Sequence, residues 1–327
     1  MIVIRDSNTY LKSSVINFDF DERIAVWCYL QLKDLITNPL NSLKGIAITA
    51  ERPYGTLKLN VDRPAVLRQY YGMDVIDKKS KEIIGRRTYG INENVTMIGT
   101  DPTGFVTKPF GYYLLKISNV LTKHLRENIK LFSLEHADLS KVFNHCTILL
   151  YYAKSNLKRY SSLGYHTDVT YDHNGKYITS RNGQLEDTPT VVLTIGNSRK
   201  LNWQRQILVK GENGRRKWIT DKCWKDHMIL NDCSITIVNS LDERPTFDPS
   251  SGHIVRYRHG GVTVKGTSIS TGFAFRVVKD RLKYDDRNKI LDTSNYPVFD
   301  HCNVENNFDK VNFHKQMKEL FESVYTF

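Results

Sequence analysis

The second half of the chain is a series of short β-like segments, and this pattern limits the fold more than any other feature. From about residue 146 to residue 278, segments rich in β-branched and aromatic residues alternate with Gly, Asn, Asp or Pro. The segments read CTILLYYA, KYITS, TVVLTIG, QRQILVK, RKWIT, SITIVNS, HIVRYR, VTVKG and TGFAFRVV. Short strands with a turn about every eight to twelve residues are typical of an antiparallel sandwich or barrel, not of a parallel α/β sheet.

Helical spacing of apolar residues occurs in three places outside this series. It spans 21–37, more clearly 112–130, and the end of the tail 305–327. Between the first two, residues 43–110 alternate short β-like runs with turn signals. We therefore expect an α+β chain in three parts: an N-terminal helical and lid-like region (1–145), a β-roll core (146–280) and a C-terminal extension with a terminal helix (281–327).

The positive charge of the chain is concentrated in two windows. Of 327 residues, 47 are Lys or Arg and 35 are Asp or Glu, which gives a formal charge of +12. Residues 197–225 hold nine basic and two acidic residues, and residues 252–281 hold six basic and one acidic residue. Such a surface favours a polyanionic partner, most often nucleic acid; a solvated basic face without a partner is the alternative. Trp203, Trp218 and Trp224 lie in the first window, where they could stack on bases or pack in the core.

Composition also excludes several classes of protein. No run of about eighteen apolar residues is present, so we expect no membrane span. The N-terminal sequence MIVIRDSNTYLKSS has no secretory signal. The five cysteines form no CxxC pair, so a disulfide framework or a cysteine-rich zinc site is not expected. We expect an intracellular protein, in the nucleus or cytoplasm, without a stable protein partner.

The sharpest local feature is the sequence GYHTD at 164–168. Residues two apart on a strand point to the same face, so His166 and Asp168 could bind one metal ion together. A second histidine from a distant strand would complete the two-histidine, one-carboxylate facial triad that binds non-haem Fe(II). The HxD pattern alone arises often by chance, and an exposed turn after Gly164 is the alternative.

The order of the motifs resembles that of the Fe(II)/2-oxoglutarate-dependent dioxygenases, and within them the AlkB-like branch. Along residues 146–278 it runs from a tyrosine-containing strand through HxD, TPTVVLTIG, LNDCSITIV and HGGVTV to FAFR. The resemblance implies a double-stranded β-helix (jelly-roll) core, bound Fe(II), 2-oxoglutarate as co-substrate and O2, with ascorbate as a further cofactor. The modified-thymine and methylcytosine oxygenases of the JBP/TET type share this scaffold and remain an alternative.

The resemblance also assigns roles to individual residues. The metal triad matches His166, Asp168 and His259, and His253 is a rival for the distal position. His259 is favoured because HGGVTVKG is similar to the distal-histidine strand of the family. The resemblance implies that Arg276, at the end of the last core strand, and Tyr152 line the 2-oxoglutarate pocket.

The chain departs from the family pattern in two places that concern the pocket. Ser270 stands where the family usually has a second arginine, so we expect Lys265 or another basic residue to bind the distal carboxylate of 2-oxoglutarate. The spacing between Asp168 and His259 is long, which indicates an insertion around 197–225. A catalytically inactive relative that binds nucleic acid is therefore a further alternative.

The expected substrate is a modified base in DNA or RNA, either single-stranded or flipped from its duplex. Its oxidation would hydroxylate or demethylate the base. Residues 85–90 and 108–110 are similar to the lid of AlkB relatives, which adds to the candidates for nucleic-acid binding. These candidates are Arg86, Arg87, Tyr89, Arg215, Arg216 and Lys217. A protein or small-molecule hydroxylase on the same scaffold is the alternative enzyme.

Overall fold

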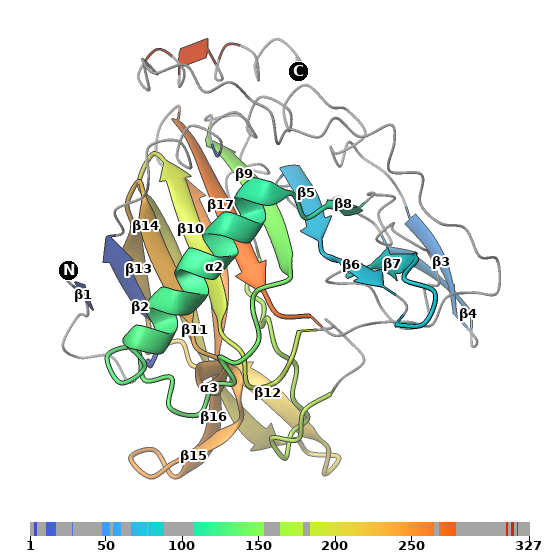
Figure 1. Ribbon diagram of the computed structural model, residues 1–327. Helices are drawn as coiled ribbons and strands as arrows, with labels where there is room; N and C mark the ends of the chain where they lie inside the picture. Colours follow the sequence, from blue (N-terminus) through green and yellow to red (C-terminus); the bar gives the residue numbers. More distant parts are fainter. Residues whose placement is uncertain are drawn as a thin grey trace.

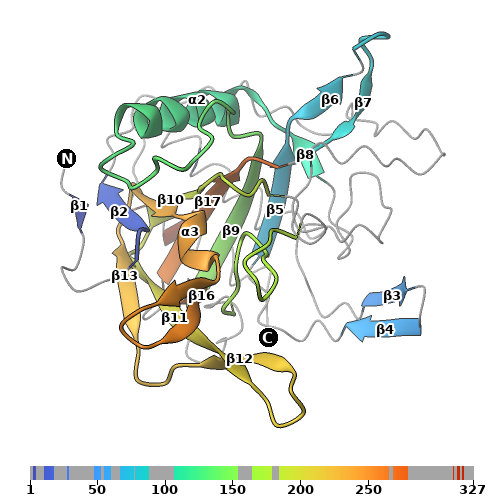
Figure 2. The ribbon, with the colours of Figure 1, turned by 90° about the horizontal axis from the view of Figure 1, so that it is seen from below.

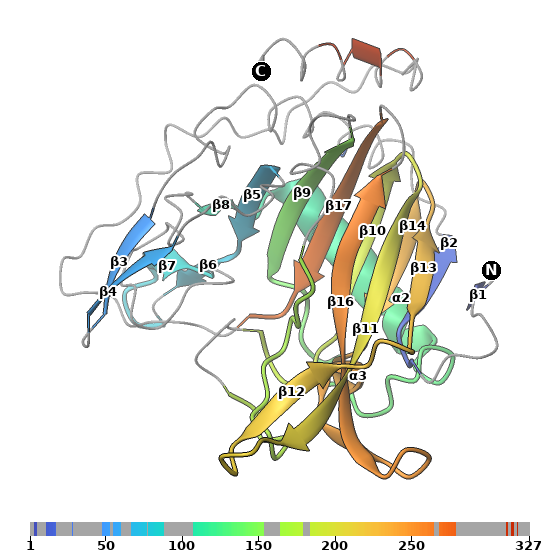
Figure 3. The same cartoon turned by 180° about the vertical axis from the view of Figure 1, so that it is seen from behind.

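A computed structural model of the chain describes residues 3–4, 11–17, 28, 48–52, 55–59, 67–76, 78–87, 107–153, 164–178, 184–264, 268–278, 312, 315–316 and 319. Two β-sheets lie face to face, and a long helix covers the outer face of the larger sheet (Figure 1). The view from behind brings the smaller sheet to the front and leaves the helix at the back (Figure 3). This layering confirms the expected core of two packed antiparallel sheets.

The larger sheet has the strand order β1-β2-β14-β10-β17-β9-β5-β8. All neighbouring strands are antiparallel except β5 and β8, which are parallel. The strands are β1 (Val3–Ile4), β2 (Ser14–Asn17), β14 (Ser234–Val238), β10 (Thr190–Gly196), β17 (Ser268–Arg276), β9 (His145–Ala153), β5 (Leu67–Gly72) and β8 (Thr107–Pro109). Strands from the N-terminal region therefore extend both edges of the sheet whose centre is built by the later segments.

The smaller sheet has the order β12-β11-β16-β15, and β13 also pairs with β11. Its strands are β12 (Arg216–Thr220), β11 (Arg199–Lys210), β16 (His253–Val264), β15 (Thr246–Asp248) and β13 (Asp226–Leu230). β11 pairs with β16 from Arg199 to Ile207, across one irregularity in the register. The first half of the window 197–225, where the spacing indicated an insertion within the roll, is therefore a central strand of this sheet.

The segments HIVRYR and VTV, which the sequence separates by His259 and two glycines, form the single strand β16. Gly260 has a φ of +143°, a conformation that disfavours any side chain. A Cβ atom at this position would also lie 2.7 Å from the carbonyl oxygen of Gly164. Glycine at 260 thus lets the segment that carries HxD pack directly against β16.

The helix α2 (Tyr112–Glu127) confirms the helical pattern over 112–130, although it ends earlier. Its apolar face consists of Leu114, Ile117, Leu121 and Leu125, each at most 1% exposed. This face covers the larger sheet (Figure 2). On the same helix, the Ser118 hydroxyl donates a hydrogen bond to the carbonyl of Phe143 at 2.7 Å. The short helix α3 (Ser240–Glu243) follows β14 and is capped by the side chain of Asn239.

A second apolar layer fills the space between the two sheets. The buried residues of this layer come from the N-terminal segment and from β9, β11, β13 and β14: Leu11, Val15, Leu149, Tyr151, Leu201, Trp203, Leu230 and Val238. Trp203 is 2% exposed, and Trp224 packs against the same layer. Packing is therefore what the structure assigns to these two tryptophans, for which base stacking was the alternative.

Several other sequence expectations have partial outcomes. In the described part of KYITS, residues 176–178, Tyr177 forms an isolated bridge with Tyr171 in place of a strand. Two hairpins, β3 (Ile48–Arg52) with β4 (Gly55–Leu59) and β6 (Asp74–Ile76) with β7 (Ile83–Arg86), lie in the N-terminal region. The expected helix at 21–37 lies outside the described residues except for Cys28, and four described residues are helical in the expected C-terminal helix. Within the described ranges, no helix is both long and apolar enough to cross a bilayer.

Candidate metal centre

Three potential ligands come from two chain segments that the fold brings side by side. His166 forms a two-residue bridge with His259 of β16: the amide of each donates to the carbonyl of the other, at 2.9 and 3.0 Å. Asp168 follows His166 by two residues, as the HxD spacing requires. His166, Asp168 and His259 each offer one ligand atom, and all three atoms lie within 4.8 Å of one another.

In each histidine, Nε2 is the ring nitrogen that lies near the carboxylate of Asp168. His259 Nε2 lies 3.5 Å from Asp168 Oδ2, and His166 Nε2 lies 3.8 Å from Asp168 Oδ1. His253, the rival distal ligand, is exposed at the start of β16 and is not part of the cluster. The three clustered residues have the composition of the facial triad of non-haem Fe(II) sites.

The environment gives each group the protonation state that a metal ligand needs. Burial, and then the neighbouring His259, lower the pKa of His166 to about 3. Burial also lowers the pKa of His259. Burial alone would raise the pKa of Asp168, but Arg276 and the two imidazoles together hold it well below its usual value. At neutral pH the donor set is therefore two neutral imidazoles and one carboxylate, which fits a divalent cation.

Arg276 contacts the metal centre itself. Its Nη2 atom donates to Asp168 Oδ1 at 2.9 Å, and Nη1 lies 3.3 Å from the hydroxyl of Thr147. Both Arg276 and Asp168 are almost fully buried. The resemblance implied that Arg276 lines the 2-oxoglutarate pocket; it lines the same pocket as the three ligands, and the carboxylate on its guanidinium is that of Asp168.

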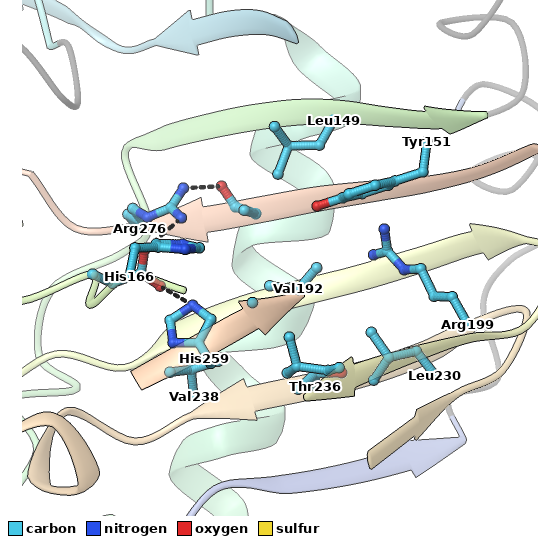
Figure 4. Close-up of a pocket in the computed structure, with 14 residues that line it drawn as sticks. Leu149, Tyr151, His166, Val192, Arg199, Leu230, Thr236, Val238, His259 and Arg276 are labelled. Carbon is cyan, nitrogen blue, oxygen red and sulfur yellow. Dashed lines mark hydrogen bonds and ion pairs between the residues drawn. The ribbon is translucent and has the colours of Figure 1, made fainter. Parts of the chain in front are cut away.

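A second arginine, Arg199, lines the same pocket at its opposite end (Figure 4). It is 3% exposed, and its Nε and Nη1 atoms have no hydrogen-bond partner among the described residues. Its guanidinium carbon lies 4.3 Å from the centre of the Tyr151 ring, and Nη2 lies 3.4 Å from the Thr194 hydroxyl. Burial lowers the pKa of Arg199, so its charge is held in an unfavourable environment.

A glycine in the neighbouring sheet makes room for this guanidinium. A Cβ atom on Gly272 of β17 would lie 2.6 Å from Arg199 Nη2. The sequence did not identify Arg199 as a site residue, because it stands among nine basic residues of one window. The register of β11 is what points the side chain of Arg199 into the space between the sheets.

The other expected pocket residues have different outcomes. Tyr151 lines the pocket, whereas the side chain of Tyr152, the next residue in β9, lies outside the described residues. Lys265 also lies outside them, as do Tyr89 and the side chain of Arg86. Arg87 donates a hydrogen bond to the carbonyl of Asp74 at 2.9 Å, so it supports the β6–β7 hairpin.

A basic surface lies next to the metal centre and begins on β16. On β16, Arg256 and Arg258 alternate with His259 and therefore point away from the pocket. The Arg256 guanidinium stacks over Trp218 of β12, with 4.4 Å between its carbon and the ring centre. Arg258 donates to the carbonyl of Tyr165, the residue before His166. Burial, and then the neighbouring charge of Arg258, lower the pKa of Arg256 to about 10.

The tip of the β11–β12 hairpin continues this basic surface. Arg215, Arg216 and Lys217 are exposed there. Arg216 donates to the side-chain oxygen of Asn174 at 2.9 Å, which ties the hairpin to the turn that follows HxD. The imidazole of His173, in the same turn, lies 6.0 Å from the Trp218 ring. The hairpin is thus joined to the segment that carries two of the three ligands.

Comparison with known proteins gives a distant likeness in structure alone. No protein-family model and no curated protein matches the chain. Among solved structures, the chain is similar to a prolyl-4-hydroxylase from Pseudomonas putida, with a TM-score of 0.34 and 10% sequence identity. The match covers 83% of this chain and 95% of that chain. A likeness of this degree says nothing about function. Any functional assignment therefore has to rest on the residues of the metal centre.

Proposed function

We propose that this protein is an Fe(II)- and 2-oxoglutarate-dependent dioxygenase. The observation that supports the proposal is the triad of His166, Asp168 and His259 at one end of a buried pocket, with Arg199 at the other end, two of whose guanidinium nitrogens have no hydrogen-bond partner among the described residues. When bound, Fe(II) and 2-oxoglutarate supply the oxidation of a C–H bond by O2, with decarboxylation of 2-oxoglutarate to succinate. The protein contributes the ligands, the orientation of the co-substrate and the exclusion of water.

Arg199 is the residue best suited to hold the far carboxylate of 2-oxoglutarate. A buried guanidinium with open N–H groups binds a carboxylate with high specificity, and the ion pair removes the cost of the isolated charge. Apolar residues line the pocket between its two ends and suit the methylene groups of the co-substrate: Leu149, Val192, Leu201 and Leu230. Arg199 would thus bind the distal carboxylate in place of the arginine that the family usually has at the position of Ser270.

Arg276 has a different task in this proposal. Through its contact with Asp168 it keeps the carboxylate ionised and fixes its orientation toward the two histidines. A ligand held in this way needs little reorganisation when a metal ion binds. Arg276 therefore supports the ligand set and leaves recognition of the distal carboxylate to Arg199.

The proposed substrate is a modified base in a nucleic acid, in agreement with the AlkB-like pattern of the sequence. His166 is the most exposed of the three ligands, with 32% of its side chain accessible, so substrate would approach from its side. Arg256, Arg258 and Trp218 lie next to this side, where cations could bind phosphates and an aromatic ring could stack on a base. The exposed Arg215, Arg216 and Lys217 extend the same positive surface.

Succinate formation tests the proposed activity. The full chain with Fe(II), 2-oxoglutarate, O2 and ascorbate should form succinate, and His166→Ala should abolish it. A wild-type rate no higher than that of His166→Ala would contradict the assignment as a dioxygenase. The same assay, with methylated single-stranded DNA, methylated RNA and proline-containing peptides added in turn, tests the substrate class.

The hairpin provides an independent test of the substrate. Combined replacement of Arg215, Arg216 and Lys217 by alanine should weaken binding of single-stranded oligonucleotides and reduce the salt dependence of that binding. Substrate-independent succinate formation should stay unchanged, because these residues do not line the pocket. Oligonucleotide binding equal to wild type, or stimulation of turnover by peptides alone, would refute a nucleic-acid substrate.

A further inference from the structure

One buried carboxylate touches both chain segments that carry the metal ligands. Glu243, in α3, is 1% exposed. Its Oε1 atom accepts a hydrogen bond from the amide of Asp168 at 2.9 Å, and Oε2 accepts one from the amide of Val169 at 2.8 Å. Oε1 also lies 3.1 Å from Nδ1 of His259, an ion-pair distance, although the contact lacks the angle of a hydrogen bond. No feature of the sequence indicated this residue.

The position of Glu243 bears on the tautomer of His259. The imidazole presents Nε2 to Asp168 and Nδ1 to Glu243. An imidazole that binds a metal through Nε2 carries its proton on Nδ1, and a carboxylate is the group that best accepts this proton. Because Glu243 also fixes the backbone of Asp168, one side chain sets both the ring of the distal ligand and the loop of the carboxylate ligand.

We propose that Glu243 is a positioning residue of the metal centre, which strengthens metal binding without itself being a ligand. The proposal rests on the proposed function, since it requires that the triad binds a metal ion. The geometry supports this role, because one carboxylate holds the backbone of Asp168 and lies beside the imidazole of His259.

The neighbouring residue Asp242 provides a matched control. It is also buried in α3, and its carboxylate also accepts backbone hydrogen bonds, from Lys12 at 2.9 Å and Ser13 at 2.8 Å. The Ser13 hydroxyl donates to it as well, at 2.6 Å. Asp242 therefore anchors the N-terminal segment before β2, whereas Glu243 anchors the ligand-bearing segments. Loss of either carboxylate costs stability, but only one of them should affect the metal.

The test compares metal binding by the wild type, Glu243→Gln and Asp242→Asn. Glutamine has one acceptor oxygen where glutamate has two, so it cannot accept both backbone hydrogen bonds and the His259 proton. Calorimetric titration of each full-length apoprotein with Mn(II) should show metal affinity about 10- to 100-fold weaker in Glu243→Gln. Asp242→Asn should bind Mn(II) like the wild type. Thermal unfolding of the same samples measures the stability cost of each change.

One further readout separates positioning from a merely structural role. In ¹⁵N NMR spectra of the Zn(II)-loaded protein, Nδ1 of His259 should carry the proton in the wild type, and its signal should shift in Glu243→Gln but not in Asp242→Asn. If Glu243→Gln fails to fold, Glu243→Asp, which keeps the charge but is one methylene shorter, is measured in the same way. Metal affinity that falls equally in Asp242→Asn, or is unchanged in the Glu243 variants, would overturn the inference and leave the dioxygenase proposal intact. A wild-type protein that binds no metal would overturn both.

Discussion

The two ends of the pocket hold their charges in opposite ways. At the metal end, the buried carboxylate of Asp168 is matched by the Arg276 guanidinium at 2.9 Å. At the far end, Arg199 is equally buried, but two of its guanidinium nitrogens have no hydrogen-bond partner within the described part of the chain (Figure 4). Described residues thus balance the charge at the first end, whereas in the proposed function the carboxylate of 2-oxoglutarate would balance the charge at the second. This asymmetry fits a pocket that takes a metal ion at one end and a dicarboxylate across its length.

The largest effect should follow from removing the balance at the metal end. Asp168→Ala removes a ligand and leaves the buried charge of Arg276 without its partner. We expect the apoprotein to lose about 3–5 kcal/mol of unfolding free energy, measured by urea denaturation, and succinate formation to disappear. The control is Asp221→Ala, because its partner Arg205 keeps a second carboxylate, Asp248. An apoprotein of Asp168→Ala as stable as that control would show that the metal end is not balanced by this pair.

The far end should respond with the opposite sign in stability. Arg199→Met removes a buried charge that has no carboxylate partner among the described residues, so the apoprotein should be as stable as the wild type or more stable. Affinity for 2-oxoglutarate should fall by about 2–5 kcal/mol, measured as the increase in its KM in the succinate assay. Lys200→Met, at the next position of β11, should leave both quantities unchanged. Destabilisation of the Arg199→Met apoprotein would mean that the protein already compensates this charge.

A smaller effect at the far end should come from Gly272→Ala. The new methyl group would lie 2.6 Å from Arg199 Nη2 and 3.2 Å from Val192 Cγ1, so the guanidinium has to shift. Crowding of this kind costs about 1–3 kcal/mol, and the KM for 2-oxoglutarate should rise less than in Arg199→Met. In a double-mutant cycle, adding Gly272→Ala to Arg199→Met should have little further effect on KM. Fully additive effects would show that Gly272 does not act through Arg199.

A lower pH perturbs the metal end without any substitution. The pKa values of His166 and His259 are lowered in the folded protein, so the unfolded chain binds more protons below its histidine pKa of 6.5. Stability of the apoprotein should therefore fall as the pH decreases from about 6.5 toward about 4, by at most about 1.4 kcal/mol per histidine and pH unit. His166→Gln should flatten this dependence. A pH-independent stability over this range would show that the histidines are not held neutral by burial.

The sequence predicted the metal end better than the far end, for a physical reason. HxD is a local pattern, and two residues on one extended segment share a face whatever the rest of the chain does. The far end depends on β11 of the smaller sheet facing β9 and β17 of the larger sheet, which brings together Arg199, Gly272 and Tyr151. No spacing within one segment encodes that combination, and the surrounding basic residues hid the arginine.

The choice of tyrosine and the choice of distal histidine show the same limit. Tyr151 and Tyr152 are adjacent, so only one of them can share the pocket face with Leu149, and the structure identifies Tyr151. His253 and His259 are six residues apart on one strand and have the same parity, so alternation cannot distinguish them. The bridge between His166 and His259 decides between them.

By itself, the sequence determined a core of short antiparallel strands, a helix within 112–130 and a paired His–Asp ligand, because these follow from local periodicity, and the family resemblance favoured His259 as the third ligand. Tertiary structure decided that the three ligands lie together, that Arg199 lines the far end of the pocket, and that Glu243 contacts both ligand segments. His166 and His259, for example, are 93 positions apart. Such residues meet only through strand register and the packing of two sheets, which no local pattern specifies.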